Sequence, residues 1–230
     1  MKNIKIFQNL DIEKVRQEAT NNLEKVLVEN SDKNILLLLS GGSALSLLSQ
    51  NMQGLNDRLT IGVLDERYSL DPKINNFSQL IETSFYLTAK EKGCKFIDTR
   101  INNNETIQDL VNRFEKELKS WKENNPTGLI IITQGMGPDG HTSGIMPRPE
   151  NDHGRWVVGY DAGNKNQYPL RVTTTLSFLK LVDVSITYIV GKEKANILNK
   201  ILSEDISPNI FPASIIKEMK KVLLFTDIKT

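Results

Sequence analysis

Apolar residues recur every three or four positions between Asp11 and Asn30, and this spacing predicts a helix that buries one stripe of its surface. Asp11 has a side chain suited to an N-cap position. The next apolar run, residues 35–39, consists of one isoleucine and four leucines and ends at Ser-Gly-Gly-Ser. A short run that is apolar on both faces is typical of a parallel strand buried between layers of helices. We expect a further helix through residues 45–48.

The same alternation of strand and helix patterns continues along the chain. The strands predicted after the first are residues 59–64, 129–133, 172–176, 184–190 and 222–226. The predicted helices are residues 77–87, 106–122, 193–202 and 213–219, and a loop-rich stretch follows His141. Alternating strands and helices favour a parallel sheet with right-handed crossovers. Because no repeat or long linker interrupts the pattern, we predict one α/β domain over residues 1–230, with a mostly parallel sheet flanked by helices on both faces.

Composition narrows the classes of function. The chain has 29 Lys and Arg against 28 Asp and Glu, a formal charge of +1, so no overall field attracts nucleic acid or a membrane surface. Cys94 is the only cysteine, which excludes an intramolecular disulfide and a zinc site built mainly on cysteine. We find no secretory signal, and no apolar run approaches the roughly 20 residues that cross a bilayer. We therefore expect a cytoplasmic protein, either a monomer or a small homo-oligomer, with neither nucleic acid nor membrane as a partner.

Ligands of open α/β sheets bind beyond the carboxyl ends of the strands, so the residues that follow each predicted strand are candidates for chemistry. Ser40-Gly41-Gly42-Ser43 lies between a strand and a predicted helix, where backbone N–H groups and the helix dipole favour an anion. A tight turn with no ligand explains the same residues equally well. The segment is not a Walker A loop, because no Gly-Lys-Ser/Thr follows.

Asp65-Glu66-Arg67 places three charges where the chain leaves the strand at residues 59–64. A run of charges is usually a solvated loop. Here the preceding strand ends in the same layer of the sheet as Ser-Gly-Gly-Ser, so Arg67 is positioned to reach an anion held there.

The segment from Gly135 to Gly140 matches Gly-x-Gly-x-x-Gly after a strand, which raises the possibility of a dinucleotide site. That motif needs a helix that starts within the glycines and receives the pyrophosphate. Pro138 lies inside the segment, and Pro147 and Pro149 end any helix soon after it. We therefore do not expect a nicotinamide cofactor.

His141 follows these glycines directly and lies two residues after Asp139, a carboxylate that can fix its tautomer. A general base and a structural histidine are both compatible with this position. The second histidine, His153, is in a polar loop and is expected to be solvated. Two histidines this far apart make a poor metal site, so we expect no metal.

Two cations complete the candidates. Arg171 opens the strand Arg-Val-Thr-Thr-Thr, and Lys194 lies in the first turn of a predicted helix. Each is unremarkable alone. A lysine in that turn opposes the helix dipole, however, and an anionic ligand beside it would explain the position.

The segments that carry a resemblance to a known family are Ser-Gly-Gly-Ser, Asp-Glu-Arg followed by Asn75-Asn76, Gly-Met-Gly-Pro-Asp-Gly-His-Thr, Arg-Val-Thr-Thr-Thr and Gly-x-x-Lys-Ala. In this combination and order the chain resembles the 6-phosphogluconolactonase family, within the wider glucosamine-6-phosphate isomerase/deaminase group. The resemblance runs from about residue 35 to Ala213, and the segment containing His141 is its most specific part. It implies a Rossmann-like fold of the isomerase/deaminase type.

The resemblance also implies an activity, the hydrolysis of 6-phospho-D-glucono-1,5-lactone to 6-phosphogluconate in the oxidative pentose phosphate pathway, without metal or cofactor. The small-molecule partner is then a sugar-phosphate lactone. In this family pattern Gly41, Gly42 and Ser43 would hold the phosphate through backbone and hydroxyl donors. Arg171 and Lys194 would supply positive charge.

The resemblance implies further roles at the lactone end of the site. His141 would deprotonate a water that attacks the lactone carbonyl, with Asp139 or Asp65 orienting or polarising the site. Arg67 would add a second guanidinium near the lactone or the phosphate.

Two alternatives remain open at this point. The deaminase branch shares these loops but uses a Glu shortly after the histidine, where this chain has Met146, whose thioether cannot transfer protons. A sugar-phosphate-binding regulator on the same scaffold would bind without turnover. The chain also departs from the usual lactonase pattern, with Ala44-Leu45 after Ser-Gly-Gly-Ser and with Gly144, which we expect to loosen the loop after His141.

Overall fold

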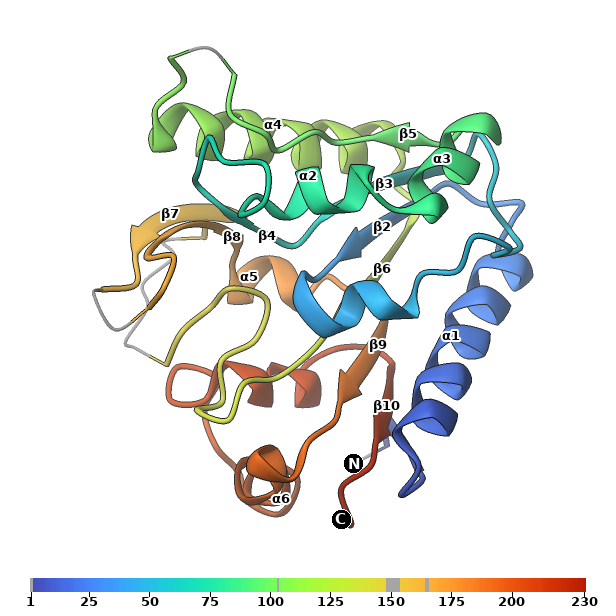
Figure 1. Ribbon diagram of the computed structural model, residues 1–230, viewed down its shortest axis with the longest axis vertical. Helices are drawn as coiled ribbons and strands as arrows, with labels where there is room; N and C mark the ends of the chain where they lie inside the picture. Colours follow the sequence, from blue (N-terminus) through green and yellow to red (C-terminus); the bar gives the residue numbers. More distant parts are fainter. Residues whose placement is uncertain (1, 103, 148–153, 164–165) are drawn as a thin grey trace.

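A seven-stranded sheet forms the centre of the computed structural model, which describes residues 2–102, 104–147, 154–163 and 166–230 (Figure 1). The strand order is β1-β10-β9-β6-β2-β3-β5, and every pairing within it is parallel. The strands are β1 (Ile4–Gln8), β2 (Ile35–Leu39), β3 (Leu59–Val63), β5 (Lys95–Phe96), β6 (Leu129–Gln134), β9 (Val184–Ile189) and β10 (Val222–Thr226). The predicted fold class, a mostly parallel α/β sheet, is confirmed.

Helices cover both faces of this sheet, and strand β2 shows why. Leu36 and Leu38 belong to one buried apolar cluster, whereas Leu37 and Leu39 belong to the other. Each fully buried leucine side chain contributes about 1.5–3 kcal/mol relative to an exposed one, so both faces of β2 need cover. The first cluster is covered by α4 (Ile107–Asn124), α5 (Leu176–Leu179), α6 (Ala195–Ser203) and η3 (Pro212–Lys217). The second is covered by α1 (Ile12–Glu29), η1 (Gly42–Leu47), α2 (Asn76–Ile81) and α3 (Ser84–Glu91).

A second, antiparallel sheet of three strands was not predicted. Its order is β4 (Asp65–Arg67), β8 (Leu170–Thr174) and β7 (Val157–Asp161). One face packs on α4, where a Cβ added to Gly159 would lie 2.8 Å from Val111. In Figure 1 the small sheet lies between α4 and the loop that follows β6. The charged residues 65–67 are therefore not a solvated loop but form strand β4.

Several boundaries differ from the sequence predictions for local reasons. The helix expected over residues 77–87 is divided into α2 and α3, because Thr83 caps a new helix by accepting a hydrogen bond from Tyr86 N. The helices expected at residues 45–48 and 213–219 are the short 3₁₀ helices η1 and η3. The helix expected at residues 193–202 begins with a 3₁₀ turn, η2 (Lys192–Lys194), before α6.

The long helices α1 and α4 agree with the prediction at both ends within two residues. Asp11 caps α1 by accepting from Glu13 N and Lys14 N, as its sequence position predicts. Among the described residues, no helix has both the length and the apolar character needed to cross a membrane.

The capping box of α4 gives a test of local stability. Thr106 accepts a hydrogen bond from Asp109 N, and the Asp109 carboxylate accepts from Thr106 N. Thr106→Ala should lower the free energy of unfolding by about 1 kcal/mol, measured by urea denaturation, because it leaves an N–H of the first turn unpaired. Thr88→Ala, inside α3, removes no cap and improves helix propensity, so it should not lower stability. Equal effects of the two substitutions would contradict the role given to the cap.

Candidate active site

A cavity of about 420 Å³ opens beyond the carboxyl ends of β2, β3, β6 and β9. This is the edge at which ligands bind in open α/β sheets, and the volume is within the range of small-molecule sites. The predicted site residues that line it are Gly41, Gly42, Asp65, Arg67, His141, Arg171 and Lys194. Residues from five separate loops and strands thus come together, as the strand-end rule predicts.

His141 is held by Asp139, its near neighbour in the same loop. His141 Nδ1 lies 2.6 Å from Asp139 Oδ1, and the backbone N–H of His141 donates to the same oxygen at 3.2 Å. A carboxylate at this distance keeps the proton on Nδ1, which leaves the lone pair of Nε2 available for a ligand or water. This contact favours the tautomer that a general base requires.

The position of the imidazole depends on a glycine. A Cβ added to Gly137 would lie 2.1 Å from His141 Cε1 and 2.7 Å from Asp139 Oδ1, so no larger residue fits without displacing the ring. Gly137 N also donates to His141 O at 2.9 Å. The glycine-rich segment thus serves to seat a histidine and its carboxylate, and within the described residues 135–147 no helix begins that would receive a pyrophosphate.

The loop after His141 is tied at several points. Thr142 and Ile145 exchange backbone hydrogen bonds, and the Thr142 hydroxyl donates to Gly135 O at 2.7 Å. From the small sheet, the Tyr160 hydroxyl donates to Gly144 O and the Thr173 hydroxyl donates to Ser143 O. These contacts keep the segment containing His141 against β7 and β8.

Gly144 has a packing role that the sequence did not indicate. Gly144 has φ +72°, in the region that favours glycine, and a Cβ there would lie 2.5 Å from Asp65 Cβ. Its lack of a side chain allows the loop to lie directly against Asp65. This glycine, which departs from the usual lactonase pattern, therefore permits close packing against Asp65.

Two arginines lie side by side in the wall of the cavity. Arg67 of β4 and Arg171 of β8 are directly opposite each other in the antiparallel pairing, so both side chains are on the same face. The Nε atoms of both are buried and have no hydrogen-bond partner among the described residues. Like charges at opposed positions destabilise a sheet, and unpaired buried donors add to this. An anion bound between the two guanidinium groups would offset both effects.

Asp65 lies behind this arginine pair. Its Oδ2 is 3.8 Å from Arg171 Nη1, and its side chain is 8% exposed. Burial raises the pKa of Asp65, while the charges of Arg171, Arg67 and His141 and a hydrogen bond from Asn76 act in the opposite direction. Of the two carboxylates proposed to partner His141, it is Asp139 that contacts the imidazole, whereas Asp65 pairs with Arg171.

Asn76 is a cavity residue to which the sequence assigned no role. Its Nδ2 donates to Asp65 O at 2.9 Å and lies 3.4 Å from Asp65 Oδ2. A Cβ added to Gly41 would lie 2.6 Å from Asn76 Oδ1, so the Asn76 amide fits against a bare backbone. The sequence showed Asn75-Asn76 after Asp-Glu-Arg as part of the family resemblance. It did not show that the chain folds back to bring Asn76 against Asp65.

Of the remaining predicted phosphate ligands, Gly41, Gly42 and Lys194 line the cavity. Gly42 has φ +64°, and a Cβ there would meet no atom within 4 Å. The backbone of Ser43 is in η1, while its side chain lies outside the described part of the structure. The helix whose dipole we expected to favour an anion here is η1, a 3₁₀ helix of six residues. Lys194 ends η2 and lines the cavity.

The sequence predicted no metal site. Among the described residues, no group of three or more His, Cys, Asp or Glu side chains is placed to hold an ion. His153, which we expected to be solvated, lies outside the described residues.

Comparison with known proteins gives a consistent result. A family model for glucosamine-6-phosphate isomerases/6-phosphogluconolactonase matches residues 10–225. A 6-phosphogluconolactonase of Thermotoga maritima is 29% identical over 205 residues, covering 87% of this chain and 86% of the relative. The 6-phosphogluconolactonase of Homo sapiens is 26% identical over 189 residues, covering 78% and 72% of the two chains.

Solved structures share the fold. A 6-phosphogluconolactonase from Plasmodium vivax superposes with a TM-score of 0.80 at 16% identity, covering 100% of this chain and 92% of that one. A 6-phosphogluconolactonase from Thermotoga maritima superposes with a TM-score of 0.69 at 24% identity, covering 97% and 98% of the two chains.

The arginine pair predicts that the protein binds phosphate. Inorganic phosphate at about ten times its dissociation constant stabilises a folded protein by about 1.4 kcal/mol, which should raise Tm by roughly 3–6 °C. Arg171→Gln should lose most of this shift. Arg100→Gln, which removes an exposed arginine paired with Asp98, should retain it. A phosphate-dependent shift that is the same in both variants would place the anion elsewhere.

Proposed function

Because the chain belongs to the glucosamine-6-phosphate isomerase/6-phosphogluconolactonase family, we propose that it hydrolyses 6-phospho-D-glucono-1,5-lactone to 6-phosphogluconate, a step of the oxidative pentose phosphate pathway. The observation that carries this proposal is the combination of His141, oriented by Asp139, and the paired arginines Arg67 and Arg171 in one cavity. A histidine base and an anion site in the same cavity suit a phosphorylated, hydrolysable substrate.

The phosphate end of the substrate binds to Arg67 and Arg171, whose guanidinium groups are the preferred partners of phosphate oxygens. Lys194 adds a third positive charge to the cavity lining. Gly41 and Gly42 line the cavity and allow close approach of the backbone to the phosphate. Asp65 keeps Arg171 in place from behind.

The lactone end lies toward His141. Nε2 takes a proton from a water molecule as the water oxygen adds to the lactone carbonyl carbon. The tetrahedral intermediate then collapses with cleavage of the bond between that carbon and the ring oxygen, and the ring oxygen receives the proton from the imidazolium. Asp139, in contact with Nδ1, stabilises the imidazolium between these steps. Protein side chains carry out every proton transfer in these steps, so the proposed reaction needs no metal or cofactor.

Met146 favours lactone hydrolysis over the isomerase/deaminase reaction. It lines the cavity a few residues after His141, where the deaminase branch carries a glutamate. A thioether cannot transfer the protons that ring opening and isomerisation require. The site therefore has the base for water activation, His141, but has Met146 in place of the glutamate that transfers protons in the deaminase branch.

For the setting of the reaction we propose what the sequence predicts. The substrate is a small soluble sugar phosphate in the cytoplasm, and the +1 charge of the chain provides no overall attraction for nucleic acid or membrane. We propose a monomer or small homo-oligomer, because one chain supplies the cations Arg67, Arg171 and Lys194 and the His141–Asp139 pair.

Removal of the base tests the proposal. His141→Ala should lower kcat for the phosphorylated lactone by about 10²- to 10⁴-fold, since general-base catalysis contributes an effect of this size. The variant should bind 6-phosphogluconate with nearly unchanged Kd, because the arginine pair remains. Turnover is measured by proton release, and binding by calorimetry.

Two results would contradict the assignment. If His141→Ala keeps wild-type kcat, the histidine is not the base. If the wild-type protein binds 6-phosphogluconate but does not accelerate lactone hydrolysis, the protein is a sugar-phosphate-binding regulator.

A glycine pair in the same loop tests whether the seat of the imidazole matters. Gly137→Ala should reduce kcat at least tenfold, because the new methyl group occupies the place of the His141 ring. Gly135→Ala adds the same methyl group where the nearest atom, Tyr188 O, is 3.5 Å away, an ordinary contact. We expect this control to keep kcat within about twofold and both variants to remain folded by circular dichroism. Equal loss in the two would show that the loop, rather than the ring position, was disturbed.

A further inference from the structure

Glu66 is a fully buried carboxylate between two cavity residues. It is the middle residue of β4, so its side chain points to the face opposite that of Asp65 and Arg67. Its exposed fraction is 0%. No function considered so far uses this carboxylate, although burying a charge is costly unless it is well compensated.

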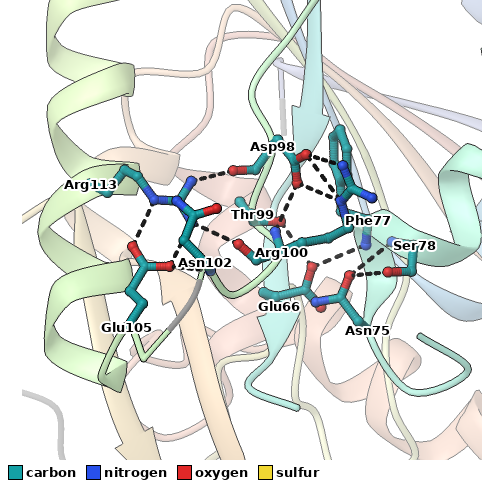
Figure 2. Close-up of polar contacts among 10 residues, drawn as sticks. All are labelled: Glu66, Asn75, Phe77, Ser78, Asp98, Thr99, Arg100, Asn102, Glu105 and Arg113. Atoms are coloured by element: carbon teal, nitrogen blue, oxygen red, sulfur yellow. Dashed lines mark hydrogen bonds and ion pairs between the residues drawn. The ribbon is translucent and has the colours of Figure 1, made fainter. Parts of the chain in front are cut away.

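Four donors surround the Glu66 carboxylate. Oε1 accepts from the backbone N–H groups of Arg67 at 2.7 Å and Asn76 at 2.6 Å. Oε2 accepts from Phe77 N at 3.0 Å and from the Thr99 hydroxyl at 2.8 Å. Figure 2 shows Glu66 between the first turn of α2, represented by Phe77, and Thr99, which lies in the segment after β5. Burial raises the pKa of Glu66 to about 7, and these hydrogen bonds oppose the shift.

The donors that Glu66 selects connect it to the cavity. Asn76, whose backbone N–H it holds, donates through its side chain to Asp65 O and approaches Asp65 Oδ2. Asp65 in turn lies beside Arg171. The carboxylate on one face of β4 thus fixes, through the start of α2, the groups on the other face.

We propose that Glu66 is a positioning residue of the active site, which holds the first turn of α2 so that the Asn76 side chain keeps Asp65, and with it Arg171, in place for the phosphate. This inference rests on the proposed function for its reaction, but its binding readout does not require turnover. A structural contact alone would be served by any well-packed side chain, whereas this arrangement needs an acceptor for two successive N–H groups of α2.

Glu66→Gln is the sharpest substitution, because glutamine keeps the shape and replaces one acceptor oxygen with a donor. The new NH₂ group faces N–H donors on one side, so at least one backbone hydrogen bond to α2 is lost. We expect kcat/KM for the lactone to fall about tenfold and the Kd for 6-phosphogluconate to rise by a similar factor.

Glu115→Gln is the matched control. Glu115 is also a buried carboxylate, 8% exposed, that accepts from a backbone N–H, Trp156 N at 2.7 Å, and from Arg155. It lies on α4, outside the cavity lining. This variant should lose stability in thermal unfolding while keeping kcat/KM and Kd within about twofold.

A double-mutant cycle tests whether Glu66 acts through Asn76. Asn76→Ala alone should also cost about tenfold in kcat/KM and Kd. The double variant should lose about tenfold, not the hundredfold of independent effects, because residues in one network are not additive.

The possible outcomes separate the two proposals. Unchanged kcat/KM and Kd in Glu66→Gln, or additive losses in the double variant, would overturn the role of Glu66. If wild-type protein binds 6-phosphogluconate without turnover, the proposed function fails, and the cycle is still decided on Kd. If 6-phosphogluconate does not bind, the Kd for inorganic phosphate takes its place in the same cycle.

Discussion

The antiparallel pairing of β4 with β8 is the interaction on which the site depends. It places Arg67 opposite Arg171 and Asp65 opposite Thr173, so one face of a three-stranded sheet carries the cations and the hydroxyl that anchors the histidine loop. Opposed guanidinium groups destabilise the pairing in the absence of an anion. The chain accepts this local penalty where the sheet is short and its other face is packed on α4, a pattern expected at functional sites.

The second constraint is that three functional side chains pack directly against the backbone of glycine residues. At Gly137 the histidine ring occupies the place of a Cβ, and at Gly144 Asp65 does so. Gly41 makes a similar contact with Asn76. Each of these contacts brings a functional side chain against bare backbone, which explains why glycines cluster in the loops beyond the strands and why the resulting loops are held tightly.

The sequence predicted the parts of the structure that have a strong periodic pattern. Residues 35–39 are apolar on both faces and form β2, while α1 and α4 have long apolar stripes and clear caps. The small sheet has no such pattern, because β4 is three charged residues. The strand-end rule singled out His141 and Arg67, whereas Arg171, at the start of its strand, received a role only through the family resemblance. The rule could not find the roles of Asn76 and Glu66, since these depend on where α2 begins in space relative to β4 rather than on a local motif.

Charge shows most clearly how a local site can differ from the whole chain. The sequence as a whole carries +1 and therefore predicts no attraction for a polyanion. The cavity lining includes three cations, Arg67, Arg171 and Lys194, and one buried carboxylate, Asp65, while His141 and Asp139 form a pair of their own. With the His141–Asp139 pair left out of the count, three cations against Asp65 leave a surplus of two positive charges. This surplus suits a phosphate monoester, which carries about −1.5 to −2 near pH 7. Asp65, which pairs with Arg171, thus reduces the repulsion between the two arginines. It does not cancel the positive charge that the phosphate needs.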